Sequence, residues 1–413
     1  MKAIFKKIIV EIISFESRIV LKKYKPFIIA VTGSVGKTST KDAIYTALST
    51  TYKVRKSEKS FNSELGVPLT ILGCPNGWSS FFVWIKNILH GLELIVFEND
   101  YPEYLILEIG ADRPGDIRDI TSWLHPDISV VTRVGKVAAH VEYFSSPEEL
   151  AKEKAYLAKG LKKDGILILS SDDEIVKGIT SEQAKETIHF GLNTNAKDIH
   201  LAYENGKVVG MSMNLIIEGE EKNIQTRGVV GTHHVYPIIV AAIVAKKVGV
   251  PLDTVVKAFE SHVPPRGRMN VLKGKNNITL LDDTYNSSPD AVYSALETLK
   301  EIQGNRRVAI LGDMLELGKY AVEAHAQVGE AARQSAQLVI SVGLRSRGMN
   351  AQHHFNTSIE AAEKVPALLR DGDIVLVKGS QGIRMERIVK VLLDPSIDSA
   401  NVLVRQEKEW MHR

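Results

Sequence analysis

The chain has 413 residues, a length that predicts two or three domains. Hydrophobic residues make up 44% and charged residues 24%, a balance that is typical of globular proteins and excludes a disordered or fibrous chain. The 52 Lys and Arg residues nearly balance 49 Asp and Glu, and the net charge of +3 excludes a dedicated nucleic-acid-binding protein. The single cysteine, Cys74, excludes a disulfide framework or a cysteine-based zinc cluster and fits a reducing compartment.

The first 25 residues are both basic and apolar. Charges interrupt every apolar run, which argues against a membrane-spanning helix and against an ordinary signal peptide. Apolar residues recur near helical spacing and predict an amphipathic helix over 1–25. This helix would either pack on the domain that follows or lie on an anionic membrane surface.

A second apolar segment spans residues 78–97. Lys86, His90 and Glu93 lie inside it, so a membrane span is not expected. The pattern favours a buried helix over a membrane contact.

Most of the remaining chain alternates between apolar runs and helical patterns. The runs are continuous rather than alternating, which indicates strands covered on both faces and therefore a largely parallel α/β sheet. The predicted strands are 26–32, 104–109, 127–134, 165–169, 278–282, 307–312, 338–342 and 373–377.

Two segments depart from this pattern. Residues 196–230 contain short alternating runs and predict a small antiparallel insert. Residues 263–268, with the sequence VPPRGR, form a rigid basic stretch that predicts a hinge between domains.

A phosphate-binding loop is predicted near the N-terminus. The strand 27–31 leads into TGSVGKTST, residues 32–40, and residues 41–48 follow as a helix. Gly33 and Gly36 allow backbone N–H groups to face phosphate oxygens, and the helix N-terminus adds partial positive charge. Lys37 would reach the β- and γ-phosphates, and the Thr38 hydroxyl would hold Mg²⁺. The strict motif begins with glycine where this chain has Val31, so a simple glycine turn is the alternative.

Glu108 ends the apolar run 104–107. A carboxylate at the carboxyl end of a buried parallel strand is costly unless it is paired or binds metal. Ligands of such sheets bind at this same edge. The sequence therefore predicts a metal ligand, with a structural ion pair as the alternative.

Lys154 lies on a predicted helix. The helix is expected to begin with a capping box formed by Ser146 and Glu149, with Pro147 as its first residue. The helical neighbours of Lys154, namely Leu150, Ala151, Leu157 and Ala158, are all apolar. A lysine on an apolar face must snorkel, pair, lower its pKa or be modified.

His140, in the loop after strand 127–134, is either a metal ligand or an ordinary loop histidine. Asp172 and Asp173 follow strand 165–169 at the same sheet edge, where a Mg–nucleotide complex is expected.

Taken together, these residues resemble the Mur ligase family, in particular its MurF type, over about residues 26–391. The similar segments are TGSVGKTSTKDAI, FNSELGVPLTIL (61–72), LEIGADRPGDI (107–117), VGKVAAHVEYF (134–144), KEKAYLAKGL, LLDDTYNSSPDA (280–291), LGDMLELG (311–318) and LVKGSQGIRME (376–386). The set is specific as a set, although no single segment is.

The resemblance implies an α/β fold with a P-loop-type central ATPase domain and a smaller Rossmann-like C-terminal α/β domain. The expected boundaries are 1–25 for the basic helix, 26–265 for the ATP-binding domain and 266–413 for the C-terminal domain. A two-domain enzyme with a hinge is expected to close over its substrates.

The resemblance also implies an ATP-dependent acid–amino-acid ligase. It would add D-Ala-D-Ala to a UDP-MurNAc-tripeptide-like acceptor through an acyl phosphate, in peptidoglycan precursor synthesis and hence cell-wall biogenesis, cell shape and division. The implied cofactors are ATP, one or two Mg²⁺ ions and a carbamylated Lys154. The implied catalytic residues are Lys37, Lys154 and His140, and the implied metal ligands are Thr38, Glu108 and His140. The implied nucleotide contacts are Gly33, Ser34, Val35, Gly36, Lys37, Thr38, Ser39, His233, Arg268 and Asp283. The implied substrate contacts are Asn62, Asn286, Asp313, Glu316 and Lys378.

The sequence departs from the family in several places. Only about 25 residues precede the phosphate loop, so the family's N-terminal UDP-sugar-binding domain is expected to be absent. The family's adenine-contacting motif, HN followed by a second Asn, is here HHVYP, residues 233–237, so both asparagines are replaced. The segment with His140 is longer by a residue or two, and Ser170 stands where an Asn is usual.

These departures leave two alternatives open. One is a family relative that joins another amino acid or peptide to another carboxylate. The other is a non-catalytic nucleotide-binding scaffold on the membrane, against which the joint presence of Lys37, Thr38, Glu108, His140 and Lys154 argues. We expect small-molecule and peptide substrates, no nucleic acid, and a monomer in the cytoplasm, with peripheral contact at the inner face of the membrane through residues 1–25.

Overall fold

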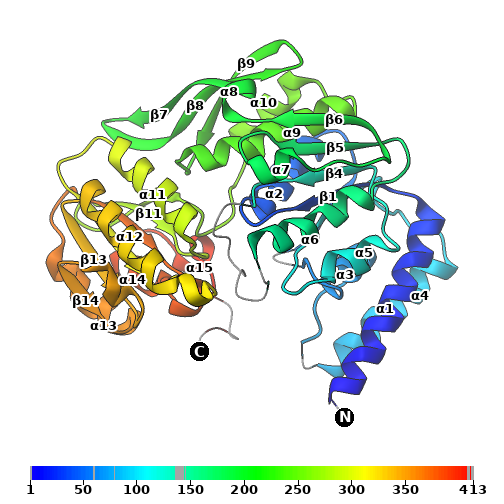
Figure 1. The fold of residues 1–413 in the computed structure, drawn as a ribbon, viewed down its shortest axis with the longest axis horizontal. Coiled ribbons are helices and arrows are strands. Elements are labelled where there is room, and N and C mark those ends of the chain that lie inside the picture. The colour runs from blue at the N-terminus through cyan, green and yellow to red at the C-terminus, as the bar shows by residue number, and fades with distance from the viewer. Residues whose placement is uncertain are drawn as a thin grey trace. The chain divides into compact units, whose positions relative to one another are not determined.

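The computed structural model describes residues 2–58, 61–78, 80–134, 144, 146–406 and 410. It divides into two compact units, which are shown in Figure 1. Unit 1 contains the described residues of 1–134, 143–195 and 236–258, and unit 2 contains 196–235 and the described residues from 259 onward. The change from unit 1 to unit 2 after Ala258 lies just before the predicted hinge at 263–268, and the segment 196–235 belongs to unit 2.

Unit 1 is built on a six-stranded parallel sheet in the order β2-β3-β1-β4-β5-β6. Every run predicted here as a strand is a strand, which confirms the parallel α/β reading. β1 lies between β3 and β4, so the chain leaves its carboxyl end toward one side and later returns on the other. This is a topological switch point, where sheets of this kind bind ligands. The strands are β1 (Phe27–Thr32), β2 (Val54–Lys56), β3 (Tyr104–Glu108), β4 (Ile128–Val131), β5 (Gly165–Ser170) and β6 (Ala184–Phe190).

Helices pack against this sheet. α2 contacts β1, β2 and β3, whereas α6 contacts β4 and β1. The strands between them are buried almost throughout, as continuous apolar runs require. The helices of unit 1 are α2 (Lys37–Leu48), α3 (Gly66–Leu72), α5 (Asp116–Thr121), α6 (Pro147–Lys159), α7 (Glu174–Lys177), α8 (Leu192–Asn195), α9 (Val235–Lys247) and α10 (Leu252–Glu260), the last two reaching its boundaries with unit 2.

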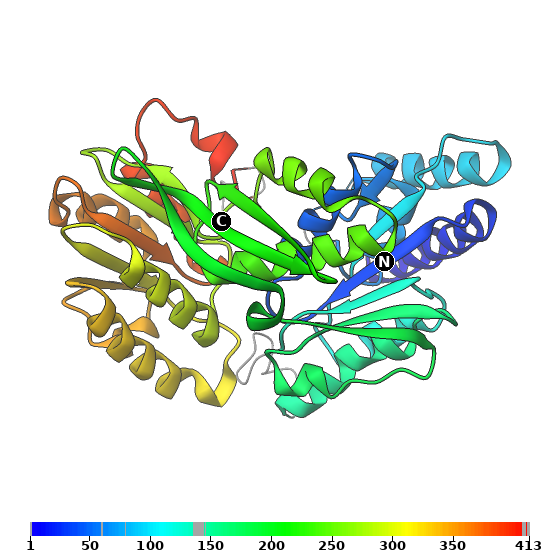
Figure 2. The same cartoon turned by 90° about the horizontal axis from the view of Figure 1, so that it is seen from above.

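Two further helices of unit 1, α1 (Lys2–Tyr24) and α4 (Phe81–Val96), pack side by side (Figures 1 and 2). The helix predicted over 1–25 is confirmed. The prediction of a buried helix at 78–97 is wrong, because α4 buries only one stripe and leaves Phe82 83% and Leu89 60% exposed. Apolar sequence alone does not say whether a face is covered. None of the described helices combines the length and apolarity needed to cross a membrane.

Unit 2 contains a second six-stranded sheet in the order β10-β11-β15-β12-β13-β14, in which only β10 is antiparallel to its neighbour. The four strands predicted after residue 270 are confirmed as β11, β12, β13 and β15. The strands are β10 (Asn270–Lys273), β11 (Thr279–Asp283), β12 (Arg307–Gly312), β13 (Leu338–Val342), β14 (His353–Phe355) and β15 (Ile374–Lys378).

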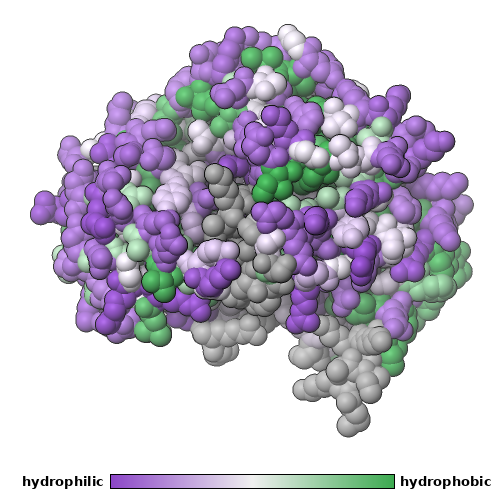
Figure 3. All heavy atoms as spheres, viewed as in Figure 1, coloured by the Kyte–Doolittle hydropathy of each residue, from purple (hydrophilic) through white to green (hydrophobic). Residues whose placement is uncertain are grey.

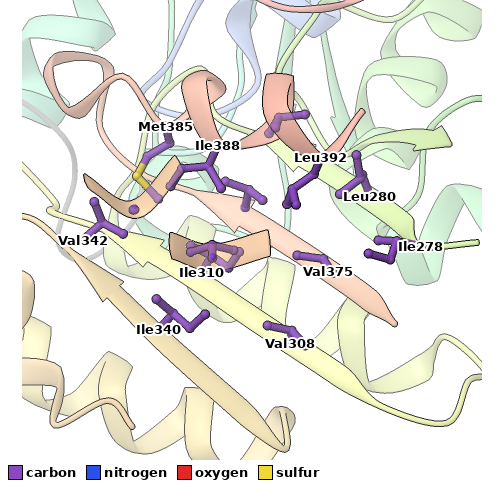
Figure 4. Packing of buried hydrophobic residues seen from close by; sticks show 14 of the residues in the cluster. Ile278, Leu280, Val308, Ile310, Ile340, Val342, Val375, Met385, Ile388 and Leu392 are labelled. Atoms are coloured by element: carbon purple, nitrogen blue, oxygen red, sulfur yellow. The ribbon is translucent and has the colours of Figure 1, made fainter. Parts of the chain in front are cut away.

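One face of this sheet packs on an apolar cluster that includes α14 (Glu386–Leu392) (Figure 4). Ile310 and Val375, on adjacent strands, face Ile388 and Leu392 of the helix, and all four are buried. The other helices of unit 2 are α11 (Pro289–Glu301), α12 (Ala321–Ser335), α13 (Ser358–Lys364) and α15 (Ser399–Val402).

The predicted antiparallel insert is also confirmed. β7 (Ala196–Glu204), β8 (Lys207–Ile217) and β9 (Glu220–Arg227) form a three-stranded antiparallel sheet, visible in Figure 2. Tight turns at Asn205-Gly206 and Glu218-Gly219, all with positive φ, join the strands as two-residue hairpin loops require.

Candidate active site

The phosphate loop of unit 1 runs from the end of β1 into α2. Gly33 has φ +145°, and a Cβ placed there would lie 1.9 Å from Thr132 Oγ1. The backbone N–H groups of Ser34 and Val35 donate to the carbonyl of Arg133 at 2.8 and 3.1 Å. The loop is thereby held against the segment after β4, and only glycine fits at position 33.

The first turn of α2 carries Lys37 and Thr38. The helix begins at Lys37 rather than at residue 41, because Gly36 takes the left-handed conformation with φ +89° directly before it. Lys37 Nζ donates to the carbonyl of Gly33 at 2.7 Å. The sequence thus places a flexible cation and a hydroxyl at a helix N-terminus, where anions are favoured.

Glu108 lies beside this turn. It ends β3 in register with Val31 of β1, and it is 1% exposed. Thr38 Oγ1 donates to Glu108 Oε2 at 3.0 Å, and Asn62 Nδ2 approaches Oε1 at 3.4 Å. Three residues separated by up to 70 positions therefore meet at the switch point of the sheet.

The chemistry of these groups fits Mg²⁺. A carboxylate and a hydroxyl are hard oxygen donors, and Mg²⁺ in phosphate sites is held by one or two protein ligands together with phosphate oxygens. Among the described residues no group of three or more His, Cys, Asp and Glu side chains is placed to hold a metal. His140, the remaining predicted ligand, lies outside the described residues.

Lys154 occupies the predicted place on α6. Ser146 Oγ accepts from the Glu149 N–H and Pro147 is the first helical residue, so the predicted N-cap and helix start are confirmed. The Lys154 side chain is 3% exposed, and burial, together with the positive charge of Lys37, lowers its pKa to about 7. Lys37 is thus near enough to act on Lys154 electrostatically, which brings α6 and the phosphate loop to one site.

The two aspartates after β5 serve unit 1 itself. Asp173 Oδ1 caps α7 by accepting from two backbone N–H groups, and its Oδ2 accepts from the Val134 N–H at 2.8 Å. Asp172 accepts from Tyr236 O–H at 2.9 Å. Both carboxylates therefore accept hydrogen bonds from groups of unit 1. The sequence had predicted instead that they face a Mg–nucleotide complex.

Tyr236 lies in the segment 233–237, where the sequence lacks both of the family's asparagines. Its ring lies 5.6 Å from the Arg133 guanidinium and edge-on to Phe190 at 6.4 Å. Burial and the bond to Asp172 raise the pKa of its hydroxyl. Tyr236 is thus held within unit 1 by its contacts with Asp172, Arg133 and Phe190.

In unit 2 the predicted residues Asp283 and Lys378 form a buried ion pair. They end the neighbouring parallel strands β11 and β15 in register, with Nζ to Oδ2 at 2.7 Å. Lys378 also donates to the carbonyl of Asn286 at 2.9 Å. Burial lowers the pKa of Lys378, and the Asp283 carboxylate opposes that effect. The pair holds the loop that carries Asn286.

Asp313 directly follows β12 at the same edge of this sheet. Its Oδ1 accepts from the Ser346 N–H at 2.7 Å. Glu316 follows with φ +62°. His325 Nε2 accepts from the Met314 N–H at 3.0 Å, which fixes the loop between them.

Arg268 and His233 lie on two adjoining segments of unit 2. The Arg268 guanidinium stacks 4.2 Å over the ring of Tyr285. Its carbonyl accepts from buried His234 Nε2 at 2.8 Å, and burial lowers the pKa of His234. His233 Nδ1 lies 3.4 Å from Ser294 Oγ.

Sequence reasoning missed Ser57 and Lys41. The Ser57 hydroxyl accepts from the Glu108 N–H at 3.1 Å, and its carbonyl accepts from fully buried Lys41 Nζ at 2.7 Å. These bonds fix the end of β3 on which Glu108 sits. β2 has three residues and gives almost no pattern, and the neighbours of Lys41 one turn earlier are the polar Lys37 and Thr38, so no local pattern marked Lys41 as buried.

Comparison with known proteins agrees with this geometry. The model of the Mur ligase middle domain matches residues 31–84 and 87–245, and that of the Mur ligase glutamate ligase domain matches 267–381. The chain therefore belongs to the Mur ligase family, whose members are ATP-dependent ligases that form carbon–nitrogen bonds.

Individual relatives show which members of the family this chain is similar to. The UDP-N-acetylmuramoyl-tripeptide–D-alanyl-D-alanine ligase of Bacillus subtilis is 27% identical over 379 residues, which cover 89% of this chain and 76% of the relative. The enzyme of the same name from Escherichia coli is 27% identical over 380 residues, with 88% and 76% covered. The MurF ligase of Thermotoga maritima in complex with ADP superimposes with a TM-score of 0.77 at 25% identity, covering 92% of this chain and 83% of that one.

Proposed function

We propose that the protein is a MurF-like ligase that adds D-Ala-D-Ala to a UDP-MurNAc-tripeptide-like acceptor in peptidoglycan precursor synthesis. The names of its relatives and the ADP complex of the Thermotoga enzyme support this reaction and ATP as its energy source. The observation that carries the proposal is local. Thr38, next to Lys37 on the first turn of α2, contacts Glu108 at the switch point of a parallel sheet, the edge at which sheets of this kind bind ligands.

The reaction takes place in two displacements. A carboxylate oxygen of the acceptor attacks the γ-phosphorus of ATP, the bond between this phosphorus and the β–γ bridging oxygen breaks, and ADP leaves. The amine nitrogen of the second substrate then attacks the carbonyl carbon of the acyl phosphate. Phosphate leaves with the C–O bonding pair, the nitrogen loses a proton, and an amide remains.

The loop and the first turn of α2 position the phosphates for the first displacement. The N–H groups at the N-terminus of α2, which follow the two loop N–H groups that Arg133 binds, are fixed dipoles that need no rearrangement during the reaction. Lys37 neutralises charge on the transferring phosphoryl group once it exchanges its bond to the Gly33 carbonyl for a phosphate oxygen.

Thr38 and Glu108 would hold Mg²⁺, and His140 completes the ligand set that the resemblance implies. A bound ion would supply positive charge that offsets the repulsion between the phosphate oxygens and the attacking carboxylate. Asn62, which contacts Glu108, would fix the orientation of that carboxylate beside its proposed role in substrate binding.

Lys154 is proposed to be carbamylated. A lysine with a pKa of about 7 is neutral in half of the molecules at pH 7, whereas an ordinary lysine is neutral in roughly one of 3,000. The neutral nitrogen adds to the carbon of CO₂, loses a proton and becomes an anionic carbamate. This change would replace the unfavourable contact with the Lys37 charge by an attractive one.

The residues of unit 2 keep their proposed roles, with one refinement. Arg268, Asp283 and His233 would contact nucleotide. Because Lys378 neutralises Asp283 and holds the Asn286 carbonyl, we propose that this pair acts mainly by orienting the loop that meets the amine substrate. Asp313 and Glu316 would contact the same substrate.

A second candidate is a ligase for another amine and carboxylate. The fold does not fix the substrate, since a pseudomurein peptide ligase of Methanothermus fervidus shares it with a TM-score of 0.63 at 16% identity. We place either ligase in the cytoplasm as a monomer, peripheral to the inner face of the membrane.

The test measures ADP release and the amide product with purified protein, ATP and Mg²⁺. We expect turnover to need both D-Ala-D-Ala and the UDP-MurNAc-tripeptide, and to fall by roughly 10³-fold or more in Lys37→Met. Lys152→Met, an exposed lysine on α6, is the matched control and should keep full activity. Turnover with another amine–acceptor pair alone would favour the second candidate, and ATP binding without amide formation from any pair would contradict both.

A further inference from the structure

Unit 1 carries an exposed apolar face that its proposed chemistry does not use. It consists of the exposed large hydrophobic side chains of residues 8–15 on α1 and 78–97 on and beside α4. Eleven of the fifteen exposed large hydrophobic side chains in the described part of the chain lie on this apolar face. Figure 3 shows hydrophobic residues gathered over the part of unit 1 where Figure 1 places these two helices. Such concentration marks an interaction site.

The apolar face has the regular spacing of one helical stripe. Phe82, Ile85, Leu89, Leu92 and Val96 recur every three or four residues and are between 38% and 83% exposed. Fourteen residues of helix separate the first from the last of them, a length of about 21 Å. The stripe is therefore a continuous surface rather than a scatter of single exposed residues.

The helices that present it are firmly held. Lys23 Nζ donates to the carbonyls of Leu94 and Ile95 at 3.0 and 3.1 Å, so that α1 caps the C-terminal end of α4. In the middle of the pair, Gly91 allows Glu16 to approach so closely that a Cβ would lie 2.2 Å from Glu16 Oε2. The apolar face is a formed part of unit 1, with its two helices fixed against each other.

Positive charge accompanies the apolar face. The first 25 residues contain seven Lys and Arg and two Glu, a surplus of five positive charges in a chain whose total is only +3. The rest of the chain is therefore slightly negative. Arg18, Lys22 and Lys86 are exposed on the same two helices, beside the exposed Glu11 and Glu93.

We propose that the apolar face lies in the interface of a membrane rich in anionic phospholipid, with α1 and α4 parallel to the surface. Aromatic and aliphatic side chains would enter the boundary between head groups and acyl chains, while Arg18, Lys22 and Lys86 would meet lipid phosphates. A second copy of the chain is a poorer occupant, because two faces with the same positive charge repel each other. This surface is separate from the phosphate loop, so it adds a location to the proposed ligase without depending on it.

The experiment measures binding of the full-length protein to sedimenting vesicles. One set contains equal parts of phosphatidylglycerol and phosphatidylcholine, and the other contains phosphatidylcholine alone. We expect binding to the first set, weakening as salt is raised. Trp78, 72% exposed beside α4, should give a blue shift in fluorescence on binding, a readout on the unmodified chain.

The test variant is Phe82→Ser with Leu89→Ser, and the matched control is Val322→Ser, an equally exposed side chain on α12 of unit 2. We expect the double variant to bind roughly tenfold or more weakly and the control to bind as the parent does. Both changes are at exposed positions, and an unchanged melting temperature verifies folding. The proposal is overturned if the parent ignores anionic vesicles, if the double variant binds like the control, or if the parent is a dimer in solution that the double variant dissociates.

Discussion

Lys154 offers the sharpest test of the site, because its burial has a calculable effect on stability. Burial and the Lys37 charge lower its pKa from 10.5 to about 7 in the folded protein. Between these values the unfolded chain binds a proton that the folded chain lacks, so the free energy of unfolding rises with pH. Each pKa unit corresponds to 1.36 kcal/mol, and the burial of this lysine therefore costs up to about 4 kcal/mol at pH 7 but only about 1 kcal/mol at pH 10.

Lys154→Met removes this cost while keeping an unbranched apolar stem. In bicarbonate-free buffer we expect it to stabilise the protein by up to about 4 kcal/mol at pH 7 and by about 1 kcal/mol at pH 10, while ligation is lost. Urea unfolding at the two pH values measures the difference, and Lys152→Met should shift stability by less than about 0.5 kcal/mol at both. A gain that is the same at pH 7 and pH 10, or a loss at both, would refute the reasoning. Added bicarbonate should stabilise the parent at pH 7 and leave the methionine variant unchanged.

Three other substitutions test buried contacts, two of them at the proposed site and one between α1 and α4. Gly33→Ala should cost several kcal/mol of stability and abolish nucleotide binding, because the new Cβ would lie 1.9 Å from a neighbouring hydroxyl oxygen. Gly206→Ala, also at positive φ but with open space around it, is the control and should cost only about 1 kcal/mol. Thermal melting measures the stability of both variants, and nucleotide titration measures their binding. Burial raises the pKa of Glu16 to about 7, so the folded protein holds a proton that the unfolded chain releases above about pH 4.5, and the free energy of unfolding should fall as pH rises toward 7. Glu16→Gln should flatten this pH dependence in urea unfolding. An unchanged pH dependence would count against the buried carboxylate. Lys378→Met leaves the buried Asp283 carboxylate without its cation and should cost about 3–5 kcal/mol in chemical denaturation, with Lys378→Met/Asp283→Leu recovering much of it; no recovery would contradict the pairing.

Several elements were determined by the sequence alone. Continuous apolar runs predicted eight strands, and all eight form and pair in parallel with a neighbouring strand, because strands covered on both faces need no polar alternation. The glycine loop between a strand and a helix, the carboxylate at the end of β3 and the lysine on an apolar helix face are all local patterns. Each could be recognised because burial of a charge or a turn at positive φ restricts which residue can stand there.

Other features depended on contacts between distant segments. The partner of Asp283 is Lys378, 95 residues away, and strand order rather than spacing made them neighbours. α2 starts at Lys37 because Gly36 is left-handed, directly after Ser34 and Val35, which are bonded to Arg133 beyond β4.

The apolar segment 78–97 shows most clearly what the sequence could not predict. The periodicity of this segment indicates that one face of α4 is apolar. The same hydrophobic residues can pack in a core, contact a lipid surface or bind a partner. Sequence determines which side chains prefer burial, and only the tertiary arrangement decides which of them find cover, because burial depends on the packing of segments that share no local pattern.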